Sequence, residues 1–263
     1  MSDAFYIAAT GLQTQQLNVD TIANNLANLN TPAFKKTRVN FTDLVAADQS
    51  INTTTETTTL QRDAGPARSG MGVGVAGIAR QFDSGALNAT GSSWDLAIRG
   101  DGFLAVSLPD GTPAYTRGGT LKVNADGLLV TQSGQVLKPS IAVPANASAM
   151  TIDAEGNVLV SVPHQSRPVH AGQLQLTRFA NPGALLAQGD GLYAETAGSG
   201  EAMAAVAGQN GTGSLQQGFL EASNVRMADE MVNLMVAQRA YEANAKVVQA
   251  SDELLALVNN LRK

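Results

Sequence analysis

Apolar and small side chains recur near the N-terminus at alternating steps of three and four positions. The pattern has one polar member, Gln15, and its large apolar members are Phe5, Leu12, Val19, Ile22, Leu26 and Leu29. This spacing predicts an amphipathic helix whose seam packs against another helix. Because proline lacks a backbone donor and forces the preceding residue out of the α region, we expect the helix to end near Asn30, Thr31 and Pro32.

A second apolar pattern runs from about Val225 to Leu261 and contains neither glycine nor proline. It consists of two adjacent stripes. Large members of the first are Leu234, Tyr241, Val248, Leu255 and Val258, and large members of the second are Val236, Val247, Leu254, Leu257 and Leu261. A surface helix on a single globule needs only one stripe, so the double stripe favours packing against more than one neighbouring helix. A simpler alternative, in which the two terminal helices pair only with each other inside one chain, stays open.

The central part of the chain changes to a period of two, and turn residues are frequent. The segment from Leu96 to Val106 reads as a strand, a turn and a second strand. Further hairpin turns are expected at Pro109-Asp110-Gly111, Ala125-Asp126-Gly127 and Ala154-Glu155-Gly156. Several short strands at this spacing predict an all-β body.

Residues 46–70 fit neither pattern. The run from Asn52 to Thr59 is polar and rich in β-branched threonine, which favours an extended segment or a long hairpin arm. The predicted fold class is therefore α+β, with long N- and C-terminal coiled-coil-like helices flanking a central all-β domain. We divide the chain into a terminal helical domain of residues 1–36 with 220–263, an extended connecting arm of residues 37–72, and a β-rich outer domain of residues 73–219.

Composition narrows the classes of function. Only 15% of the 263 residues are charged, and the net charge is −5. No extended basic stripe is present in the sequence, which argues against nucleic acid as a partner. The absence of cysteine excludes disulfides, thiol catalysis and thiolate metal sites. Because no lysine or arginine precedes the first apolar stretch, we do not expect a cleavable secretory signal.

Two patterns that can indicate cofactor or metal chemistry are weak here. Gly72, Gly74 and Gly77 match the letters of the dinucleotide fingerprint, but the following residues read as a strand where that fingerprint requires a helix. A flexible or bulged glycine stretch is the expected structure. His164 and His170 stand near prolines without a compact ligand cluster, so we expect loop residues and not metal ligands. The sequence also lacks a serine nucleophile elbow and a P-loop, and we expect no catalytic residue, metal site or cofactor.

Four parts of the sequence form a longer and more specific pattern. They are residues 18–36 (NVDTIANNLANLNTPAFKK), residues 95–103 (DLAIRGDGF), residues 108–119 (LPDGTPAYTRGG), and residues 217–225 (QGFLEASNV) with 236–242 (VAQRAYE). Together they closely resemble the bacterial flagellar axial proteins, the rod and hook subunits, and within that family the distal rod members. The positions that we take as the family signature are Asn24, Asn25, Leu26, Asn28, Thr31, Phe34, Lys35, Asn224, Gln238, Arg239 and Tyr241. At Ala33 this chain departs from the glycine that usually precedes the phenylalanine.

The resemblance implies a structural protein of the flagellar basal body and not an enzyme. It implies export through the flagellar type III apparatus, then self-assembly into a hollow helical tube that spans the periplasm. Implied partners are further copies of the chain, proximal rod subunits, hook subunits, and the peptidoglycan-layer and outer-membrane ring proteins. Alternatives are a proximal rod or hook-type subunit, or a secreted β-rich binding module whose helices form a closed oligomer.

Phe41 and Val45 have the spacing of the export motif that the resemblance implies, a phenylalanine followed four residues later by an apolar residue. This spacing also occurs often by chance. Ordinary core packing of the two side chains is therefore an alternative to export recognition, and the two interpretations are compatible.

Overall fold

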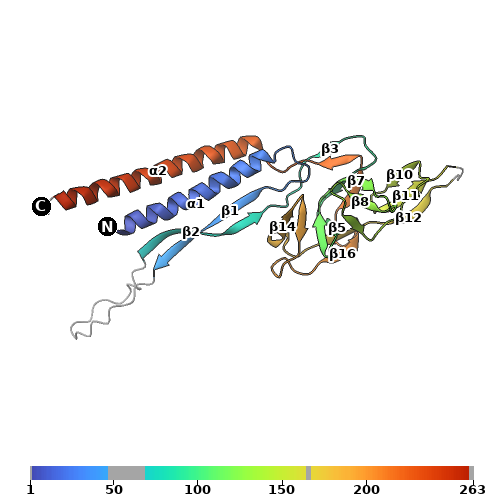
Figure 1. The fold of residues 1–263 in the computed structure, drawn as a ribbon, viewed down its shortest axis with the longest axis horizontal. Coiled ribbons are helices and arrows are strands. Elements are labelled where there is room, and N and C mark those ends of the chain that lie inside the picture. The colour runs from blue at the N-terminus through green and yellow to red at the C-terminus, as the bar shows by residue number, and fades with distance from the viewer. Residues whose placement is uncertain (1, 47–68, 164–166, 261–263) are drawn as a thin grey trace, which may run out of the picture. The chain divides into compact units, whose positions relative to one another are not determined.

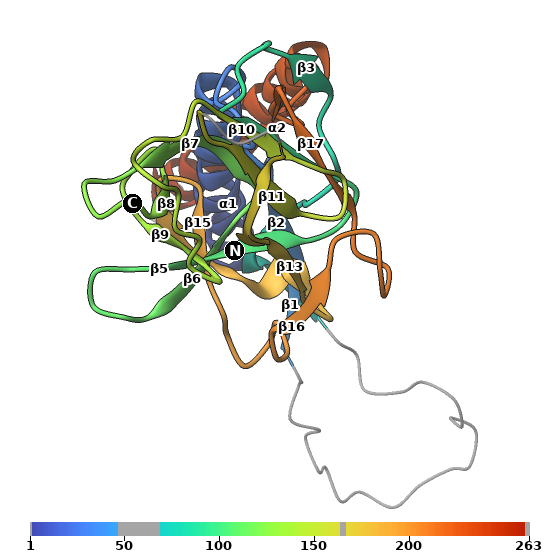
Figure 2. The same ribbon diagram turned by 90° about the vertical axis from the view of Figure 1, so that its right-hand side faces the viewer.

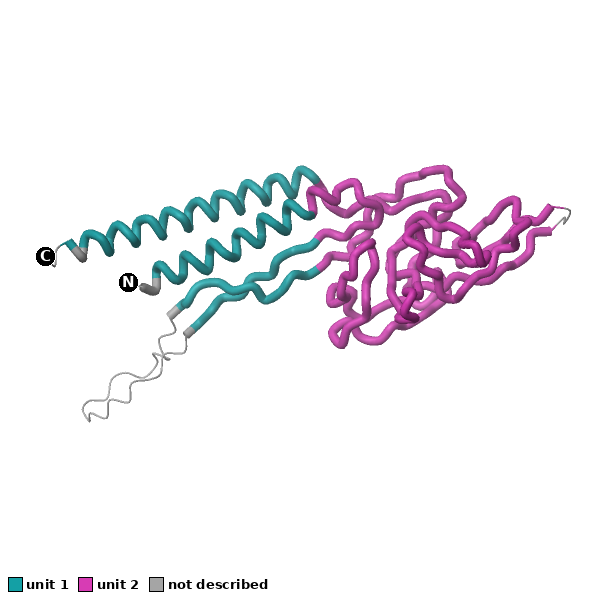
Figure 3. Tube along the Cα trace, viewed as in Figure 1, with its two compact units in different colours: residues 1–24, 37–79, 227–263 teal, residues 25–36, 80–226 magenta. Residues whose placement is uncertain are grey.

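The computed structural model describes residues 2–46, 69–163 and 167–260. Two long helices and many short strands make up this part of the chain, which confirms the predicted α+β class (Figure 1). The chain divides into two compact units (Figure 3). Unit 1 comprises residues 1–24, 37–79 and 227–263, and unit 2 comprises residues 25–36 and 80–226. Both units therefore combine segments that lie far apart in the sequence.

Helix α1, Ser2–Ala27, follows the predicted N-terminal pattern. Three of its buried residues are polar, and two of them, Thr14 and Thr21, carry hydroxyls. Their hydroxyls donate to the carbonyls of Thr10 and Leu17, one turn earlier, at 2.9 and 2.8 Å. These bonds satisfy the hydroxyl donors, so the threonines can be buried at little cost.

Helix α1 ends earlier than predicted, at Ala27, so the predicted seam residue Leu29 lies beyond the helix. The N–H groups of Asn28 and Leu29 donate to carbonyls three residues earlier, both at 3.2 Å. A hydrogen bond between residues three positions apart forms a tighter turn than the four-residue spacing of an α-helix. Asparagine side chains compete for backbone hydrogen bonds, and the cluster of asparagines before Pro32 therefore favours turns over another helical turn.

Helix α2, Met227–Asn260, lies where the second pattern predicts a helix, and Leu261 falls outside the described residues. Asp229 and Glu230 occupy its first turn, where negative charge complements the helix dipole. The helix approaches α1 closely, because a Cβ on Gly11 would lie 2.7 Å from Asn244 Nδ2. Glycine at position 11 therefore permits this helix contact.

Strands β1, Thr37–Ala46, and β2, Ser69–Arg80, form a two-stranded sheet. The hairpin contacts α1, because the Val73 N–H donates to Thr10 Oγ1 at 3.3 Å. Gly72 has a φ of 109°, and a Cβ there would overlap the same hydroxyl. The glycine pattern that begins at Gly72 is thus part of a strand packed on α1. The threonine-rich run of residues 52–59 lies outside the described residues.

Unit 2 contains the other strands, most of which are labelled in Figure 2. They are β3 Leu87–Ala89, β4 Asp95–Arg99, β5 Phe103–Ser107, β6 Pro113–Thr116, β7 Gly118–Val123, β8 Leu129–Thr131, β9 Val136–Lys138, β10 Ala149–Ile152, β11 Asn157–Ser161, β12 Val169–Gln173, β13 Gln175–Arg178, β14 Leu186–Gly189, β15 Leu192–Ala194, β16 Met203–Val206, β17 Ser214–Gln217 and β18 Phe219–Glu221, with a 3-10 turn η1 at Pro182–Ala184.

The strands of unit 2 form three sheets. The largest has eleven strands, with the order β14-β15-β6-β5-β9-β8-β7-β4-β17 and with β13 and β16 attached through β5. A second sheet contains β10, β11 and β12, and a third pairs β18 with β3. The three predicted hairpin turns are confirmed, because they join β5 to β6, β7 to β8 and β10 to β11 in antiparallel pairs.

One expected connection differs from a hairpin. Strands β4 and β5 form in the predicted segment, but β4 pairs with β7 and β17, whereas β5 pairs with β6, β9 and β13. Gly100 and Gly102, with φ of 105° and 135°, separate the two strands. Their carbonyls accept hydrogen bonds from Arg117 at 2.9 and 2.7 Å. The turn is built around this guanidinium, which redirects the chain away from its own preceding strand.

A large apolar core joins the eleven-stranded and three-stranded sheets. It includes the fully buried side chains of Ile98, Leu129, Leu137 and Val158. A smaller cluster is mainly aromatic, with Phe103, Tyr115, Phe179 and Tyr193 packed edge to face. Most of the largest fully buried side chains lie in unit 2.

We expect Gly72→Ala to loosen the hairpin from α1. A residue with a Cβ is strained at this φ, by about 1 to 3 kcal/mol, and it would displace the Thr10 hydroxyl that binds the Val73 N–H. Hydrogen exchange at the β1 and β2 amides should therefore accelerate about tenfold or more. Gly70→Ala is the matched control, because nothing lies within 4 Å of a Cβ there. Equal exchange in the two variants would contradict the proposed packing.

Candidate functional site

The carboxylate of Glu221, in β18, is buried between two cations. Its Oε1 lies 2.6 Å from the Lys35 ammonium nitrogen, and its Oε2 lies 3.2 Å from Arg117 Nε. The Arg117 Nη2 and the Gly85 N–H also donate to Oε1, at 3.2 and 2.9 Å. All three charged side chains are at most 2% exposed. The cluster joins segments from the beginning, middle and end of the chain, all within unit 2.

Each cation of this cluster has further acceptors. The Lys35 ammonium donates to the carbonyl of Asp83 at 2.8 Å, and Arg117 Nη1 donates to the carbonyls of Gly100 and Gly102. No buried side-chain nitrogen or oxygen of the described residues lacks a hydrogen-bond partner. Buried charges are tolerated when they are paired and fully hydrogen-bonded, and this cluster meets both conditions.

The pKa values of the cluster reflect two cations around one carboxylate. Burial alone would raise the pKa of Glu221, but the adjacent Arg117 guanidinium and Lys35 ammonium outweigh burial and hold it below its usual value. Burial lowers the pKa of Lys35, and the attraction of Glu221 only partly opposes this effect. The carboxylate is therefore the charge on which the cluster depends, because without it two cations would remain buried together.

Asn224 connects the same segments through its side-chain amide. Its Oδ1 accepts from the Lys36 N–H at 2.8 Å, and its Nδ2 donates to the carbonyls of Gln81 and Asp83 at 2.9 and 3.2 Å. The backbone adds a bond of 2.7 Å from the Ala33 N–H to the Glu221 carbonyl. Two signature motifs, separated by most of the sequence, thus bind each other directly.

Arg80 forms a third link in this region. Its guanidinium carbon lies 5.9 Å from the centre of the Phe34 ring and 5.4 Å from that of Tyr193, and Nη1 donates to the Tyr193 hydroxyl at 3.3 Å. Cation–π contacts of this kind stabilise by about 0.5 to 2 kcal/mol. Phe34, which the sequence analysis places in the signature, therefore contributes to the internal structure of unit 2. We call Phe34, Lys35, Arg117, Glu221 and Asn224, with Arg80, the junction cluster.

The rest of the signature lies elsewhere and differs in exposure. Asn25 is 2% exposed and Asn28 and Leu26 are half-buried, whereas Asn24 and Thr31 are exposed. On α2, Gln238, Arg239 and Tyr241 are exposed, and Arg239 pairs with Glu242 at 2.9 Å. Phe34, Lys35 and Asn224 of the signature thus make internal contacts in unit 2, whereas Asn24 and the three α2 residues lie at the surface of unit 1.

The two predicted stripes of α2 have different environments. The first includes the buried Ala237 and the half-buried Leu234, Asn244 and Val248, although Tyr241 and Leu255 remain 42% and 46% exposed. The second stripe is mostly open. Its described large side chains have these exposed fractions: Val236 63%, Val247 46%, Leu254 57% and Leu257 61%. The single chain therefore buries part of one stripe and leaves the other uncovered.

On α1, the predicted seam is also only partly covered. Ile22 is 5% exposed, Leu12 and Val19 are half-buried, and Phe5 is 46% exposed. The helix pair seen in one chain is thus compatible with the simpler alternative of intramolecular pairing. It does not by itself cover the apolar surface of the two helices.

Phe41 and Val45 lie on β1 with exposed fractions of 42% and 48%. The interpretation that Phe41 and Val45 pack in a core within the chain is therefore wrong. Their side chains are exposed because alternate residues of a strand share a face, and this face of β1 is not covered.

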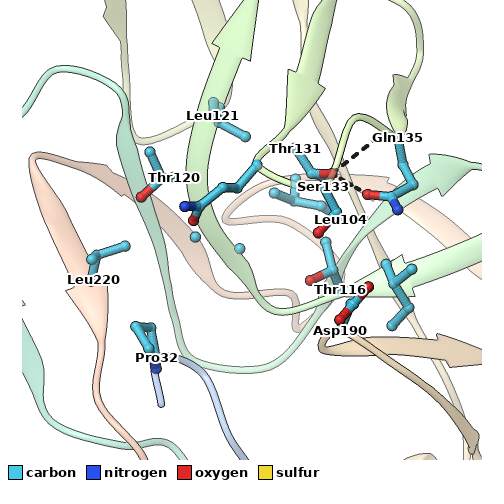
Figure 4. A pocket seen from close by; sticks show the side chains of 14 residues that line it. Pro32, Leu104, Thr116, Thr120, Leu121, Thr131, Ser133, Gln135, Asp190 and Leu220 are labelled. Carbon is cyan, nitrogen blue, oxygen red and sulfur yellow. Dashed lines mark hydrogen bonds between the residues drawn. The ribbon is translucent and has the colours of Figure 1, made fainter. Parts of the chain in front are cut away.

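A small polar cavity of about 160 Å³ lies in unit 2 (Figure 4). Hydroxyls and amides dominate its lining, including Thr116, Thr131 and Gln135, and Asp190 is its one charged lining residue. The hydroxyl of Thr131 donates to the Gln135 side chain. This arrangement offers hydrogen-bond groups but no pair of titratable side chains for acid–base chemistry.

The described residues contain no group of three or more histidine, aspartate or glutamate side chains that could hold a metal ion. His164 lies outside the described residues, and His170 is on β12 with its ring 3.5 Å from the Asn157 side chain. The prediction that it is a loop residue is wrong, because residues 169–173 pair with β11 as a strand. No described helix combines the length and the apolar character that crossing a lipid bilayer requires.

Comparisons with known proteins identify the family to which these sequence motifs belong. Residues 5–35 match the family model of the flagella basal body rod protein, residues 97–160 that of the flagellar hook protein FlgE/F/G D1 domain, and residues 216–261 that of the flagellar basal body rod FlgEFG protein C-terminal region. The flagellar basal-body rod protein FlgG of Borreliella burgdorferi is 44% identical over the full length of both chains.

The chain belongs to the flagellar basal-body rod protein family. The FlgG proteins of Caulobacter vibrioides and Bacillus subtilis are 41% and 37% identical, over 98% and 100% of this chain and 99% and 100% of theirs. A FlgF protein of Caulobacter vibrioides is 31% identical over 97% of the chain and 95% of its own. This rod protein is therefore a structural component of the flagellar basal body and is close to FlgG.

Sequence reasoning missed three residues of the junction cluster. Arg117 and Glu221 lie inside the motifs of residues 108–119 and 217–225, but their roles depend on long-range contacts. A signal was present, since Arg117 is the one cation of its motif and Glu221 is the one charged residue of its own, and buried pairing is a natural explanation for both. Arg80 had no comparable signal, because it is the last residue of the glycine-rich strand β2 and lies outside the motifs.

We expect Glu221→Gln to destabilise unit 2 by about 3 to 5 kcal/mol, because it leaves Lys35 and Arg117 buried without a counter-charge. The single tryptophan, Trp94, lies in unit 2, so its fluorescence during denaturant unfolding measures this change. Glu201→Gln is the control, since Glu201 is exposed. A loss below about 1 kcal/mol would show that the cluster does not stabilise the unit.

The same residue predicts a pH dependence. Because the pKa of Glu221 is lower in the folded chain than its usual 4.5, its stabilisation is complete above that value and declines as the pH falls toward the folded-state pKa. The free energy of unfolding of the rod protein should therefore fall below about pH 4.5 more steeply than that of Glu221→Gln. Parallel curves for the two proteins between pH 5 and pH 2.5 would contradict this assignment.

Ala33 adopts the left-handed conformation that the family's usual glycine would favour, with a φ of 56°. This conformation costs a residue with a Cβ about 1 to 2 kcal/mol, which glycine would relieve. The greater flexibility of glycine in the unfolded chain offsets part of this stabilisation. Ala33→Gly should therefore raise the free energy of unfolding of unit 2 by about 0.5 to 1 kcal/mol. A destabilised Ala33→Gly variant in the Trp94 fluorescence assay would contradict this interpretation.

Proposed function

We propose that this rod protein is a subunit of the distal flagellar rod, which self-assembles into a hollow helical drive shaft. The chain is 44% identical to one FlgG relative over its whole length but only 31% identical to a FlgF relative. This difference supports the distal rod over other axial positions. The proposed role is mechanical, with no catalytic step and no cofactor. The subunit would transmit torque from the proximal rod subunits to the hook subunits.

The observation that carries the assembly proposal is the open apolar stripe of α2. Four large side chains at Val236, Val247, Leu254 and Leu257 are 46% to 63% exposed. A stripe of this length is costly in water, because burial of apolar surface gains about 25 cal/mol per Å². In the proposed polymer the stripe packs against neighbouring copies, and the half-buried stripe remains the coiled-coil-like contact with α1.

In the proposed tube, each predicted domain has its own position. The terminal helical domain of residues 1–36 and 220–263 would form the wall of the tube, and the β-rich domain of residues 73–219 would form its outer part. The arm of residues 37–72 would connect them, and its strand β1 lies with the helices in unit 1. The peptidoglycan-layer and outer-membrane ring proteins would then contact the outer surface as the rod crosses the periplasm.

The exposed Phe41 and Val45 fit recognition by the flagellar type III export apparatus, because side chains that are read by a partner must be accessible. Exposure on β1 is compatible with their use before folding and leaves them available for contacts afterwards. We propose export recognition as their role.

We expect Val247→Asp to prevent self-assembly while the isolated chain keeps its stability. Val247 is 46% exposed, so an aspartate there stays hydrated in the single chain but must be desolvated between copies. Sedimentation and electron microscopy of the purified protein measure assembly. Gln249→Asp is the matched control, because this residue is exposed and lies two positions away, on the opposite side of the helix.

The outcomes separate the functions under consideration. Filaments or tubes of increasing length from the unchanged chain and from Gln249→Asp, but not from Val247→Asp, support the proposal. A single stable mass at all concentrations would indicate a closed oligomer and contradict it. Filaments from Val247→Asp equal to those of the unchanged chain would show that the stripe is not the assembly surface.

A further inference from the structure

Unit 1 has a groove of about 600 Å³ between α1 and the β1–β2 hairpin. Its walls come from both sides: α1 contributes Tyr6 and Leu17, β1 contributes Leu44, and β2 contributes Val73 and Val75. Tyr6, Leu44 and Val75 are 52%, 37% and 39% exposed, so the apolar wall is accessible. The hydrogen bond from Val73 to Thr10 holds the hairpin at this distance from the helix.

The rim of the groove is polar but carries little charge. Gln13 and Gln16 are exposed neutral amides, and Asp20 is the one charged residue that lines the groove. The lining residues on α1 run from Tyr6 to Asp20, which corresponds to about 21 Å of helix. An apolar ridge of similar length, with a cation near its edge, would match this lining in shape and in charge.

The open stripe of α2 has these properties. Its part from Val236 to Leu254 spans about 27 Å along the helix, and Ala243 and Ala250 continue it between the larger residues. Arg239 and Lys246 lie along one edge of the stripe. Arg239 is paired with Glu242, whereas Lys246 forms no ion pair among the described residues.

The groove and the stripe are separate surfaces of unit 1. Helix α1 contacts α2 near Gly11 and Asn244, while Thr10 contacts the hairpin. The stripe of α2 is rotated away from Asn244, and its large side chains are uncovered within the chain. A contact between two different surfaces is heterologous, and repeating it produces an open assembly unless the rotation happens to close.

We propose that this groove receives α2 of a second copy of the chain, with Lys246 of that copy beside Asp20. The proposal rests on the self-assembly proposed above and adds the two surfaces that meet. The apolar stripe covers Leu17, Leu44 and Val75, and the lysine neutralises the one charge of the groove. The hairpin then acts as one wall of the receiving site, which gives β1 and β2 a direct role in assembly.

Cysteine pairing provides a direct test, because the chain contains no cysteine. Chains carrying Gln13→Cys are mixed with chains carrying Val247→Cys under assembly conditions and then oxidised. A disulfide requires Cα atoms within about 7 Å, and each chain has only one cysteine, so any heterodimer reports a contact between copies. The proposal predicts that heterodimers exceed both homodimers. Gln249→Cys replaces Val247→Cys as the control and should give few heterodimers.

A charge exchange tests the predicted pair. Asp20→Lys and Lys246→Asp should each raise the critical concentration for assembly about fivefold, with a smaller effect at high salt, and the double variant should return it toward the original value. Assembly without Gln13–Val247 heterodimers, or a double variant as impaired as both single changes combined, would overturn this proposal and leave self-assembly intact. Absence of any polymer from the unchanged chain would instead contradict the proposed function, and this proposal with it.

Discussion

The burial of the Glu221 carboxylate between Lys35 and Arg117 is the contact on which the arrangement of the chain depends. Three charges leave water at this point, and only a complete set of partners compensates for their lost hydration. The partners come from the segment after α1, from the segment after β2, from Arg117 between β6 and β7, and from β18. Loss of the Glu221 carboxylate would leave both buried cations without a counter-charge, so the cluster depends on this one group. The beginning and the end of the chain are thereby held together inside one folded unit.

This constraint has a consequence for the terminal helices. Helix α1 ends at Ala27 and α2 begins at Met227, and the segments that lead into them, residues 33–36 and 221–224, bind each other through Glu221 and Asn224. The two helices therefore do not need extensive burial against each other to remain associated. Their contact is close near Gly11 and Asn244, and much of the remaining apolar surface of α2 is exposed in the single chain. Charge pairing in unit 2 holds these two segments together, and the large apolar side chains of the second α2 stripe stay exposed in the single chain.

The sequence predicted well those features that depend on local periodicity and turn chemistry. Both helices and the three hairpins at Gly111, Gly127 and Gly156 follow from patterns of a few residues. The failures involve distant partners. The turn between β4 and β5 is shaped by Arg117, and the glycine pattern at Gly72 is explained by a threonine on α1. The role of Lys35 likewise depends on a glutamate 186 positions away, which no local pattern contains. Family resemblance identified Phe34, Lys35 and Asn224 as important, but the structure was needed to show that their roles are internal.

The distribution of charge explains how one chain can combine a stable fold with extensive association. With 15% charged residues, this chain places its strongest charge pairs inside unit 2 and leaves α1 with Asp3 and Asp20 as its only charges. A surface with few charges has a low cost of desolvation when it is buried, so neighbouring copies can pack closely without many compensating ion pairs. The few charges that do flank an apolar surface then have a large influence on which surfaces meet, because an unpaired charge in a dry contact is costly. In the proposed assembly, apolar area would provide the affinity, and isolated charges such as Asp20 and Lys246 would determine its register.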